Sequence, residues 1–224
     1  MKFAVKKEIV PLAIVIIMFI AGILAYSRLP ERIPIHWNLR GIADGFAGKN
    51  PFTALLFPII ALFMWALFLA LPIVDPKKEK YAQFTREYGI IRNTLIGFMG
   101  FVYALIIVNS TGGTIPIEKA IPFAIGVLFI VLGNLMGKIR QNFFVGFKFP
   151  WTLSSEEVWN RTHRLGGKLM VLSGVLTIAG VFFGPLASMI LMLSSLGVMV
   201  LTTIVYSYRL YKKAGEKAPS QDHQ

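Results

Sequence analysis

Long apolar runs alternate with short polar segments along the whole chain. Most of these runs reach the ~17–25 residues that a helix needs to cross a bilayer, and the shorter third and fifth gain length from flanking residues. The first run is longer than the ~7–15-residue core of a signal peptide and lacks a clear cleavage site, which favours a retained span. The pattern predicts six transmembrane helices, at about 9–26, 52–74, 94–108, 120–137, 169–184 and 188–206.

The composition supports a membrane protein, because 55% of the residues are hydrophobic and only 15% are charged. The net charge of +12 could indicate a nucleic-acid partner, so the positions of the basic residues decide its meaning. If the N-terminus is cytosolic, 18 of the 23 Lys and Arg residues fall in cytosolic segments. An excess of Lys and Arg in the cytosolic loops determines the orientation of a membrane protein in the bilayer. We therefore expect both termini in the cytosol. The partners of the basic residues would be anionic membrane lipids, and no direct nucleic acid binding is expected. The chain has no cysteine, which excludes thiolate chemistry.

The same pattern predicts how the chain is divided. Residues 1–75 would hold two transmembrane helices and an outer loop, and 76–119 an interfacial segment and the third helix. Residues 120–210 would hold three further helices, and 211–224 a disordered tail. Asp75-Pro76 looks like a helix start, so the interfacial segment is either an amphipathic helix on the membrane surface or an extension of the third span.

A polar segment at 148–167 separates the fourth and fifth runs. Ser154 and Glu157 have the spacing of a capping box, and Pro150 separates this segment from the preceding helix. Gly166-Gly167 is a suitable helix end. The segment predicts a short cytosolic interfacial helix near 153–165, so the expected fold is an all-α integral membrane protein with six transmembrane helices and this additional element.

The outer loop between the first two runs is rich in turn-forming residues. Its candidate residues for recognition of an extracellular ligand are Pro34, His36, Trp37, Asn38, Gly41 and Asp44. One interpretation is a compact cap with Trp37 at the membrane interface, as in aromatic belts. The other is a surface that recognises an extracellular ligand.

Two motifs resemble known families. The outer loop follows the pattern L-P-x-x-I-P-x-H-W-N-x-x-G-x-x-D of a prokaryotic membrane domain. Residues 133–167 resemble the SdpI family of toxin-immunity and signalling proteins, with departures at Gly137, Phe147 and Phe149. The positions that carry this second resemblance are Gly146, Pro150, Trp151, Thr152, Leu153, Ser154 or Ser155, Val158, Trp159, Thr162, His163, Arg164 and Gly167.

The resemblance implies immunity against a secreted peptide toxin, at the cell membrane, and capture of a cytosolic transcriptional repressor as a second role. The residues that we expect to couple the protein to such a partner, or to stabilise the bundle, are Pro150, Trp151, Thr152, Glu157, Trp159, Thr162, His163 and Arg164.

Catalysis is not expected. The three histidines fall in an outer loop, a cytosolic segment and the tail, so no convergent catalytic or metal site is predicted, and no cofactor is expected. The alternative function is a small-solute transporter or channel. Transporters usually carry ionisable residues within the bilayer, and here the only intramembrane polar candidate singled out is Asn134.

Overall fold

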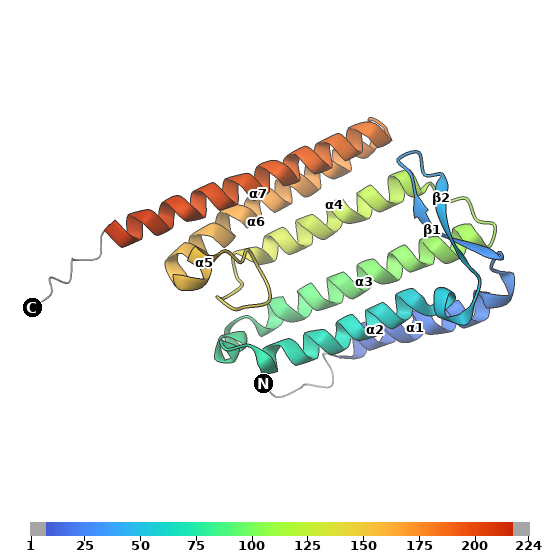
Figure 1. The fold of residues 1–224 in the computed structure, drawn as a ribbon, viewed down its shortest axis with the longest axis horizontal. Helices are drawn as coiled ribbons and strands as arrows, with labels where there is room; N and C mark the ends of the chain where they lie inside the picture. The colour runs from blue at the N-terminus through green and yellow to red at the C-terminus, as the bar shows by residue number, and fades with distance from the viewer. Residues whose placement is uncertain (1–7, 217–224) are drawn as a thin grey trace, which may run out of the picture.

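The computed structural model describes residues 8–216, and these form a helical bundle with one β-hairpin (Figure 1). Six helices are long and apolar enough to cross a membrane. They are α1 (Ile9–Ala25), α2 (Pro51–Val74), α3 (Thr85–Ser110), α4 (Ile117–Met136), α6 (Glu156–Val181) and α7 (Pro185–Glu216). The shorter elements are the 3₁₀ helices η2 (Tyr26–Arg28) and η3 (Lys78–Gln83), the strands β1 (Arg32–Trp37) and β2 (Ala43–Gly48), and the five-residue helix α5 (Pro150–Ser154).

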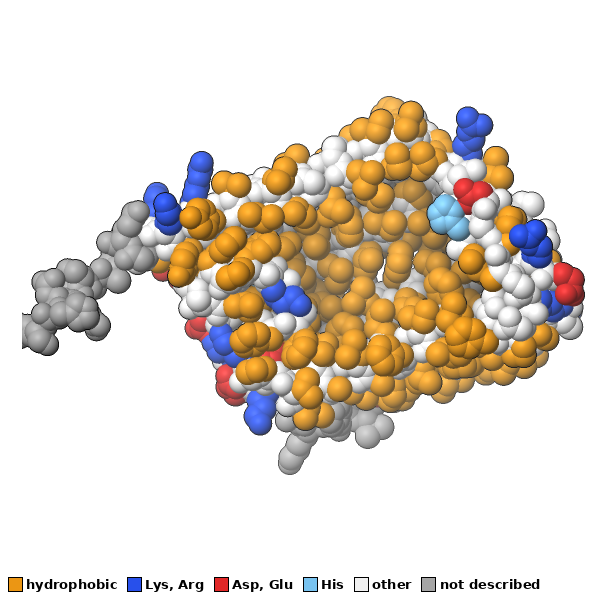
Figure 2. Space-filling view, in the orientation of Figure 1, with side chains coloured by type: hydrophobic (Ala, Val, Ile, Leu, Met, Phe, Trp, Pro, Cys, Tyr) orange, Lys and Arg blue, Asp and Glu red, His pale blue; other side chains and the backbone are white. Residues whose placement is uncertain are grey.

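The six long helices form two layers (Figure 1). α1, α2 and α3 make one layer, and α4, α6 and α7 make the other. The β-hairpin lies at one end of the bundle, hereafter the hairpin end. α5 and the loops around it lie at the opposite end, hereafter the α5 end, where α1 begins and α7 finishes. Much of the outer surface of both layers is hydrophobic, as expected for helices that face lipid (Figure 2).

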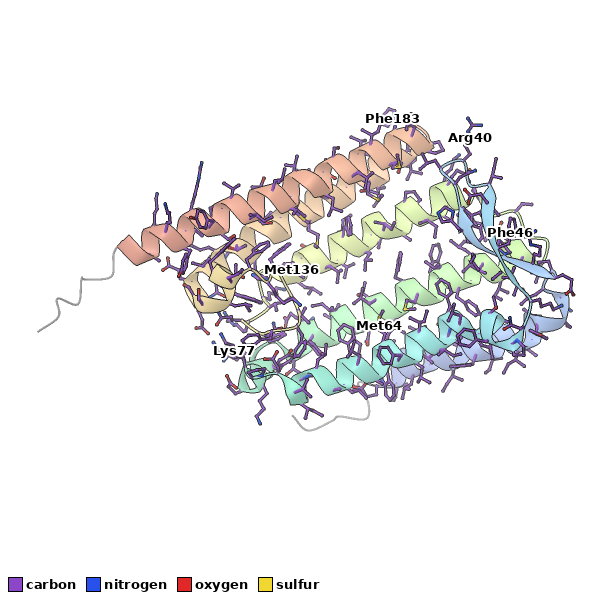
Figure 3. All side chains as sticks on the ribbon, viewed as in Figure 1. Arg40, Phe46, Met64, Lys77, Met136 and Phe183 are labelled. Carbon is purple, nitrogen blue, oxygen red and sulfur yellow. The ribbon has the colours of Figure 1, made fainter. Side chains whose placement is uncertain are left out.

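The layers are joined most firmly at the α5 end. A buried cluster there combines aromatic and aliphatic side chains from α2, η3, α3, α4 and α6. Met64 on α2 and Met136 on α4 reach this cluster from the two layers (Figure 3). The cluster consists of Phe68, Tyr81, Phe84, Tyr88, Ile91, Leu135, Met136, Ile139 and Trp159.

Glycines bring α4 and α6 into backbone contact. A Cβ atom on Gly133 would lie 2.7 Å from the carbonyl oxygen of Gly167, and one on Gly126 would lie 2.7 Å from that of Gly174. Small residues permit such close approach of membrane helices. The tight contact between these helices therefore depends on two pairs of glycines.

Three sequence predictions are wrong in their boundaries. Gly166-Gly167 does not end a helix, because α6 continues unbroken from Glu156 to Val181. The predicted separate helix near 153–165 is thus divided between α5 and the first turns of α6. Asp75 ends α2 and does not begin a helix. The segment after it forms η3 and then joins the extended third helix, which was the alternative prediction.

The expectation of an all-α fold missed the hairpin. β1 and β2 pair antiparallel with irregularities on either side of His36, and these bulges obscure the alternation by which a strand is recognised. At the other end of the chain, α7 includes residues 211–216 that were predicted to be a disordered tail. The rest of that tail, with His223, and the N-terminal lysines lie outside the described residues.

Candidate functional site

The hairpin brings together all six residues predicted for the outer loop. Pro34, His36 and Trp37 belong to β1, while Asn38 and Gly41 form the turn. The Asn38 side-chain oxygen accepts hydrogen bonds from the backbone N–H groups at positions 40 (2.9 Å) and 42 (3.2 Å). Gly41 has φ +71°, which glycine adopts without steric cost. The sequence forms this turn because side-chain capping and glycine freedom coincide in it.

His36 and Asp44 face each other across the hairpin, with Nδ1 of the imidazole 2.5 Å from Oδ1 of the carboxylate. Both side chains are exposed to solvent. Gly45 pairs with His36 in the strand register, and a Cβ there would lie 2.8 Å from the His36 Cβ. The pair is therefore held in an accessible position at the hairpin end.

A cavity of about 380 Å³ lies beneath the hairpin, between the two layers. β1, α2, α3, α4 and α7 all contribute to its wall, which is mainly apolar. His36, Trp37 and Asn38 border it on the hairpin side, while Glu118 and Ser188 add polar groups from α4 and α7. Three of the six predicted recognition residues therefore border a cavity that is open on one side. The sequence offered no signal for this space, because its wall comes from five separate elements.

At the α5 end, Trp159 and His163 form a fully buried stack, with ring centroids 3.9 Å apart. His163 Nε2 accepts a hydrogen bond from the Phe147 backbone N–H (2.9 Å), so the ring proton is on Nδ1 and is donated to the Trp159 carbonyl (2.9 Å). The Trp159 indole donates to the Ile139 carbonyl (2.9 Å). Trp159 and His163 are four residues apart in α6, so both side chains lie on one face of this helix.

Thr152 and Trp151 fix α5 against the rest of the protein. The Thr152 hydroxyl donates to the Phe147 carbonyl (2.9 Å) and accepts from the Phe149 N–H (2.8 Å). The Trp151 indole donates to the Ser207 hydroxyl of α7 (2.6 Å). These hydrogen bonds attach α5 both to the loop that precedes it and to α7.

The N-cap of α6 is Ser155, whose hydroxyl accepts from the Val158 N–H (3.3 Å). The predicted cap, Ser154, instead donates back to the Trp151 carbonyl. A serine therefore caps the helix as predicted, but it is the residue after the predicted one. Sequence spacing alone could not decide between two adjacent serines.

The remaining residues predicted for this end fall into two groups. Thr162 is fully buried, and its hydroxyl has no hydrogen-bond partner among residues 8–214. Glu157 and Arg164 are exposed, and Glu157 pairs with Arg161 at 3.4 Å. The structure thus separates buried residues that build this end from exposed ones that are available to a partner. Asn134 is exposed on α4 and donates to the Ile130 carbonyl of its own helix (2.8 Å).

Sequence reasoning missed a buried carboxylate at the α5 end. Asp75 accepts hydrogen bonds from the Tyr81 hydroxyl (2.9 Å), the Lys77 N–H (2.7 Å) and the Phe143 N–H (3.0 Å). Burial and the neighbouring Asp75 carboxylate raise the pKa of Tyr81 well above its usual range, so the phenol remains a donor. The clue in the sequence was an acidic residue directly after an apolar run, but we interpreted it as a helix cap.

Lys77 extends this network to the second layer. Its ammonium group contacts the Gln141 side chain and lies 3.4 Å from the Leu153 carbonyl. The Gln141 amide in turn donates to the carbonyls of Thr152 (2.8 Å) and Leu153. Partial burial and the nearby Lys80 lower the pKa of Lys77. The end of α2 is therefore tied to α5 through polar groups (Figure 3 marks Lys77).

No group of three or more His, Cys, Asp or Glu side chains comes together as a metal site within residues 8–214. His36 and His163 lie at opposite ends of the bundle. The arrangement places an exposed hairpin over a cavity at one end and a tightly hydrogen-bonded junction at the other.

Comparisons with known proteins find sequence similarity over most of the chain. Residues 138–207 match the SdpI/YfhL protein family, and residues 13–62 match a domain of unknown function, DUF1648. The chain is 29% identical over 209 residues to the immunity protein SdpI of Bacillus subtilis (strain 168), an alignment that covers 93% of this chain and 97% of that protein. No solved structure matches the chain. The six apolar helices and these similarities together identify a multi-pass membrane protein.

Proposed function

We propose that this membrane protein confers immunity to a secreted peptide toxin that attacks the cell membrane. The observation that carries the proposal is the similarity to an immunity protein over nearly the full length of both chains. The match is not confined to one motif, so it includes both the hairpin and the α5 end. These two ends correspond to the two motifs that the sequence singled out.

The charge distribution supports an orientation with the hairpin end outside the cell. The loops at the hairpin end carry few basic residues, and 18 of the 23 Lys and Arg residues belong to segments at the α5 end or to the two terminal segments. Positively charged segments are retained in the cytosol. In this orientation the exposed His36–Asp44 pair and the cavity face the side from which a toxin arrives.

The hairpin is the proposed recognition element. Pro34, Trp37 and the Asn38–Gly41 turn shape it, while His36 and Asp44 offer exposed polar groups. The toxin would bind at this end and be kept from the membrane. Binding needs no chemical conversion of the toxin, so the proposed protein is not an enzyme.

The α5 end is the proposed coupling element. Exposed Glu157 and Arg164 are available to a cytosolic partner such as a transcriptional repressor. Pro150, Trp151, Thr152, Thr162 and the Trp159–His163 stack would set the shape of that surface from beneath. Substitutions of the buried residues would therefore change coupling indirectly.

A transport function gains no support from Asn134. Its side chain is exposed on α4 and hydrogen-bonded within its own helix. A polar side chain that serves a solute pathway would instead face the bundle interior or a water-filled cavity.

The decisive test is protection of a sensitive host. The protein is expressed in a bacterium that lacks its own immunity gene, and killing is measured with peptide toxins encoded beside this gene and its relatives. We expect survival with the wild-type protein and reduced survival with His36→Ala, while Glu87→Gln at the α5 end serves as a matched control. Unchanged killing by every such toxin would overturn immunity as the function.

The coupling role has a separate test. A fluorescent fusion of the neighbouring repressor is followed by microscopy with and without toxin. We expect it to move to the membrane only when toxin and this protein are both present, and to remain in the cytosol with Arg164→Glu. A repressor that stays in the cytosol with the wild-type protein would contradict capture but would leave immunity intact.

A further inference from the structure

The cavity under the hairpin is mainly apolar but is bordered by one carboxylate. Its wall is almost entirely aliphatic and aromatic, with Phe57 from α2, Ile106 from α3, Ile121 from α4 and Met192 from α7. Its volume of about 380 Å³ falls within the ~300–1,000 Å³ of small-ligand pockets. A complete helix, about 10–12 Å in diameter, would not fit into it. The cavity is suited to a few apolar side chains of a larger ligand.

One carboxylate contributes to this apolar wall. Glu118 is half-buried in the first turn of α4 and lies against Gly41 of the hairpin turn, where a Cβ would be 2.4 Å from its Oε2. No ion pair of Glu118 is formed with any residue from 8 to 214. The start of a helix stabilises a negative charge. That effect explains why a carboxylate is tolerated at this position, but it supplies no positive partner.

A buried or partly buried charge gains most when a partner of opposite sign accompanies it. Glu118 is the one acidic side chain that borders the cavity among the described residues, and no Lys or Arg borders it. The wall of the cavity thus carries one carboxylate and no Lys or Arg, which makes it complementary to a cation.

We propose that the cavity binds a cationic, apolar segment of a peptide, with apolar side chains inside and an ammonium or guanidinium group on Glu118. The inference rests on the proposed function, because it names the part of a toxin that the hairpin end would hold. Asn38 and Trp37 at the rim would offer hydrogen-bond groups to the backbone of that segment. A peptide with a negative charge at the same position would be excluded.

The test uses the full-length protein in lipid nanodiscs and two synthetic probes. One probe is the peptide amide Lys-Ile-Leu-Phe-Leu, acetylated at its N-terminus, and the other carries Glu in place of Lys. Binding is measured by calorimetry, with empty nanodiscs subtracted to remove partition into lipid. We expect saturable binding of the Lys probe alone, and at least about tenfold weaker binding to Glu118→Gln, as for loss of a charge-assisted hydrogen bond.

Two further variants test the location of the site. Ile121→Trp fills the cavity and should abolish binding, with folding checked by the helical circular dichroism signal. Glu31→Gln removes an exposed carboxylate at the same end that does not border the cavity, and it should bind as the wild type does. Absence of saturable binding of the Lys probe, equal binding of both probes, or equal binding to wild type, Glu118→Gln and Ile121→Trp would overturn the inference.

The outcomes separate this inference from the proposed function. If the wild type fails to protect cells but the Lys probe binds in a Glu118-dependent manner, the site stands and immunity fails. If the wild type protects cells while Glu118→Gln and Ile121→Trp bind and protect equally well, immunity stands and the site is overturned.

Discussion

Gly146 allows a quantitative test of how tightly the α5 end is built. Its φ of +127° lies in a region that side chains rarely adopt. A Cβ added there would lie 2.2 Å from His163 Nε2 and 3.1 Å from the Trp159 ring. His163 cannot easily retreat, because it is fully buried, stacked on Trp159 and hydrogen-bonded through both ring nitrogens.

The substitution Gly146→Ala therefore carries two costs. The backbone conformation costs about 1–3 kcal/mol for a residue with a side chain, and overpacking of a filled interior costs about 1–3 kcal/mol more. Gly112 provides a matched control, since its φ is +100° and nothing lies within 4 Å of its Cβ position. In Gly112→Ala only the backbone conformation should lower the free energy of unfolding. The two variants should thus differ by about 1–3 kcal/mol, or about 2–4 °C in Tm for each kcal/mol in a chain of this length.

The measurement is unfolding of the purified protein in mild detergent, followed by circular dichroism during heating or during titration with sodium dodecyl sulfate. A second background separates the two costs further. In His163→Ala the closest neighbour of the new Cβ is removed and only the Trp159 ring at 3.1 Å remains, so the additional cost of Gly146→Ala over Gly112→Ala should fall. Equal destabilisation by the two alanine substitutions in the wild-type background would refute the argument that His163 occupies that space.

The other predictions concern packing between α4 and α6 and the buried carboxylate. Gly133→Ala should lower the free energy of unfolding by about 1–3 kcal/mol, because its Cβ would meet the backbone of α6. Gly97→Ala is the control and should not lower this free energy, because nothing lies within 4 Å of its Cβ position. Equal losses in the two variants would contradict the role of the glycine contact. Asp75→Asn should cost about 1.5–3 kcal/mol, since it weakens hydrogen bonds to a charged acceptor. In the same detergent titration, an unchanged midpoint for Asp75→Asn would show that the network does not join the layers.

Hydropathy predicted the spans well, because a segment that crosses lipid has to satisfy all its backbone hydrogen bonds internally and therefore forms a continuous helix. The side chains of that helix have to be largely apolar along its entire length. The third span is an informative case. Its apolar part was short, and the structure supplies the missing length from residues 85–93, which include buried Arg92 paired with Glu8 at 2.7 Å. A buried ion pair between distant segments makes a charged residue compatible with the helix, and no local pattern reports such a partner.

The candidate residues were predictable to the extent that they depend on local geometry. Trp159 and His163 are four residues apart on a helix, so their contact followed from spacing. Gly166 and Gly167 were misinterpreted, because a glycine that ends a helix and one that admits a neighbouring helix are identical in sequence. Gly167 contacts α4 and Gly166 contacts the Phe147 ring, so only the tertiary arrangement distinguishes the two roles.

The paired glycines of α4 and α6 also limit how the molecule can change shape. Close contacts fall at Gly126 and Gly133 on one helix and at Gly167 and Gly174 on the other, which are seven residues apart in each case. If either helix slid by one turn, a branched side chain such as Ile130 would be driven into the opposite backbone. These two helices therefore have a fixed register and should move as one lever. A change in the shape of the bundle would then take place between the two layers and not between α4 and α6.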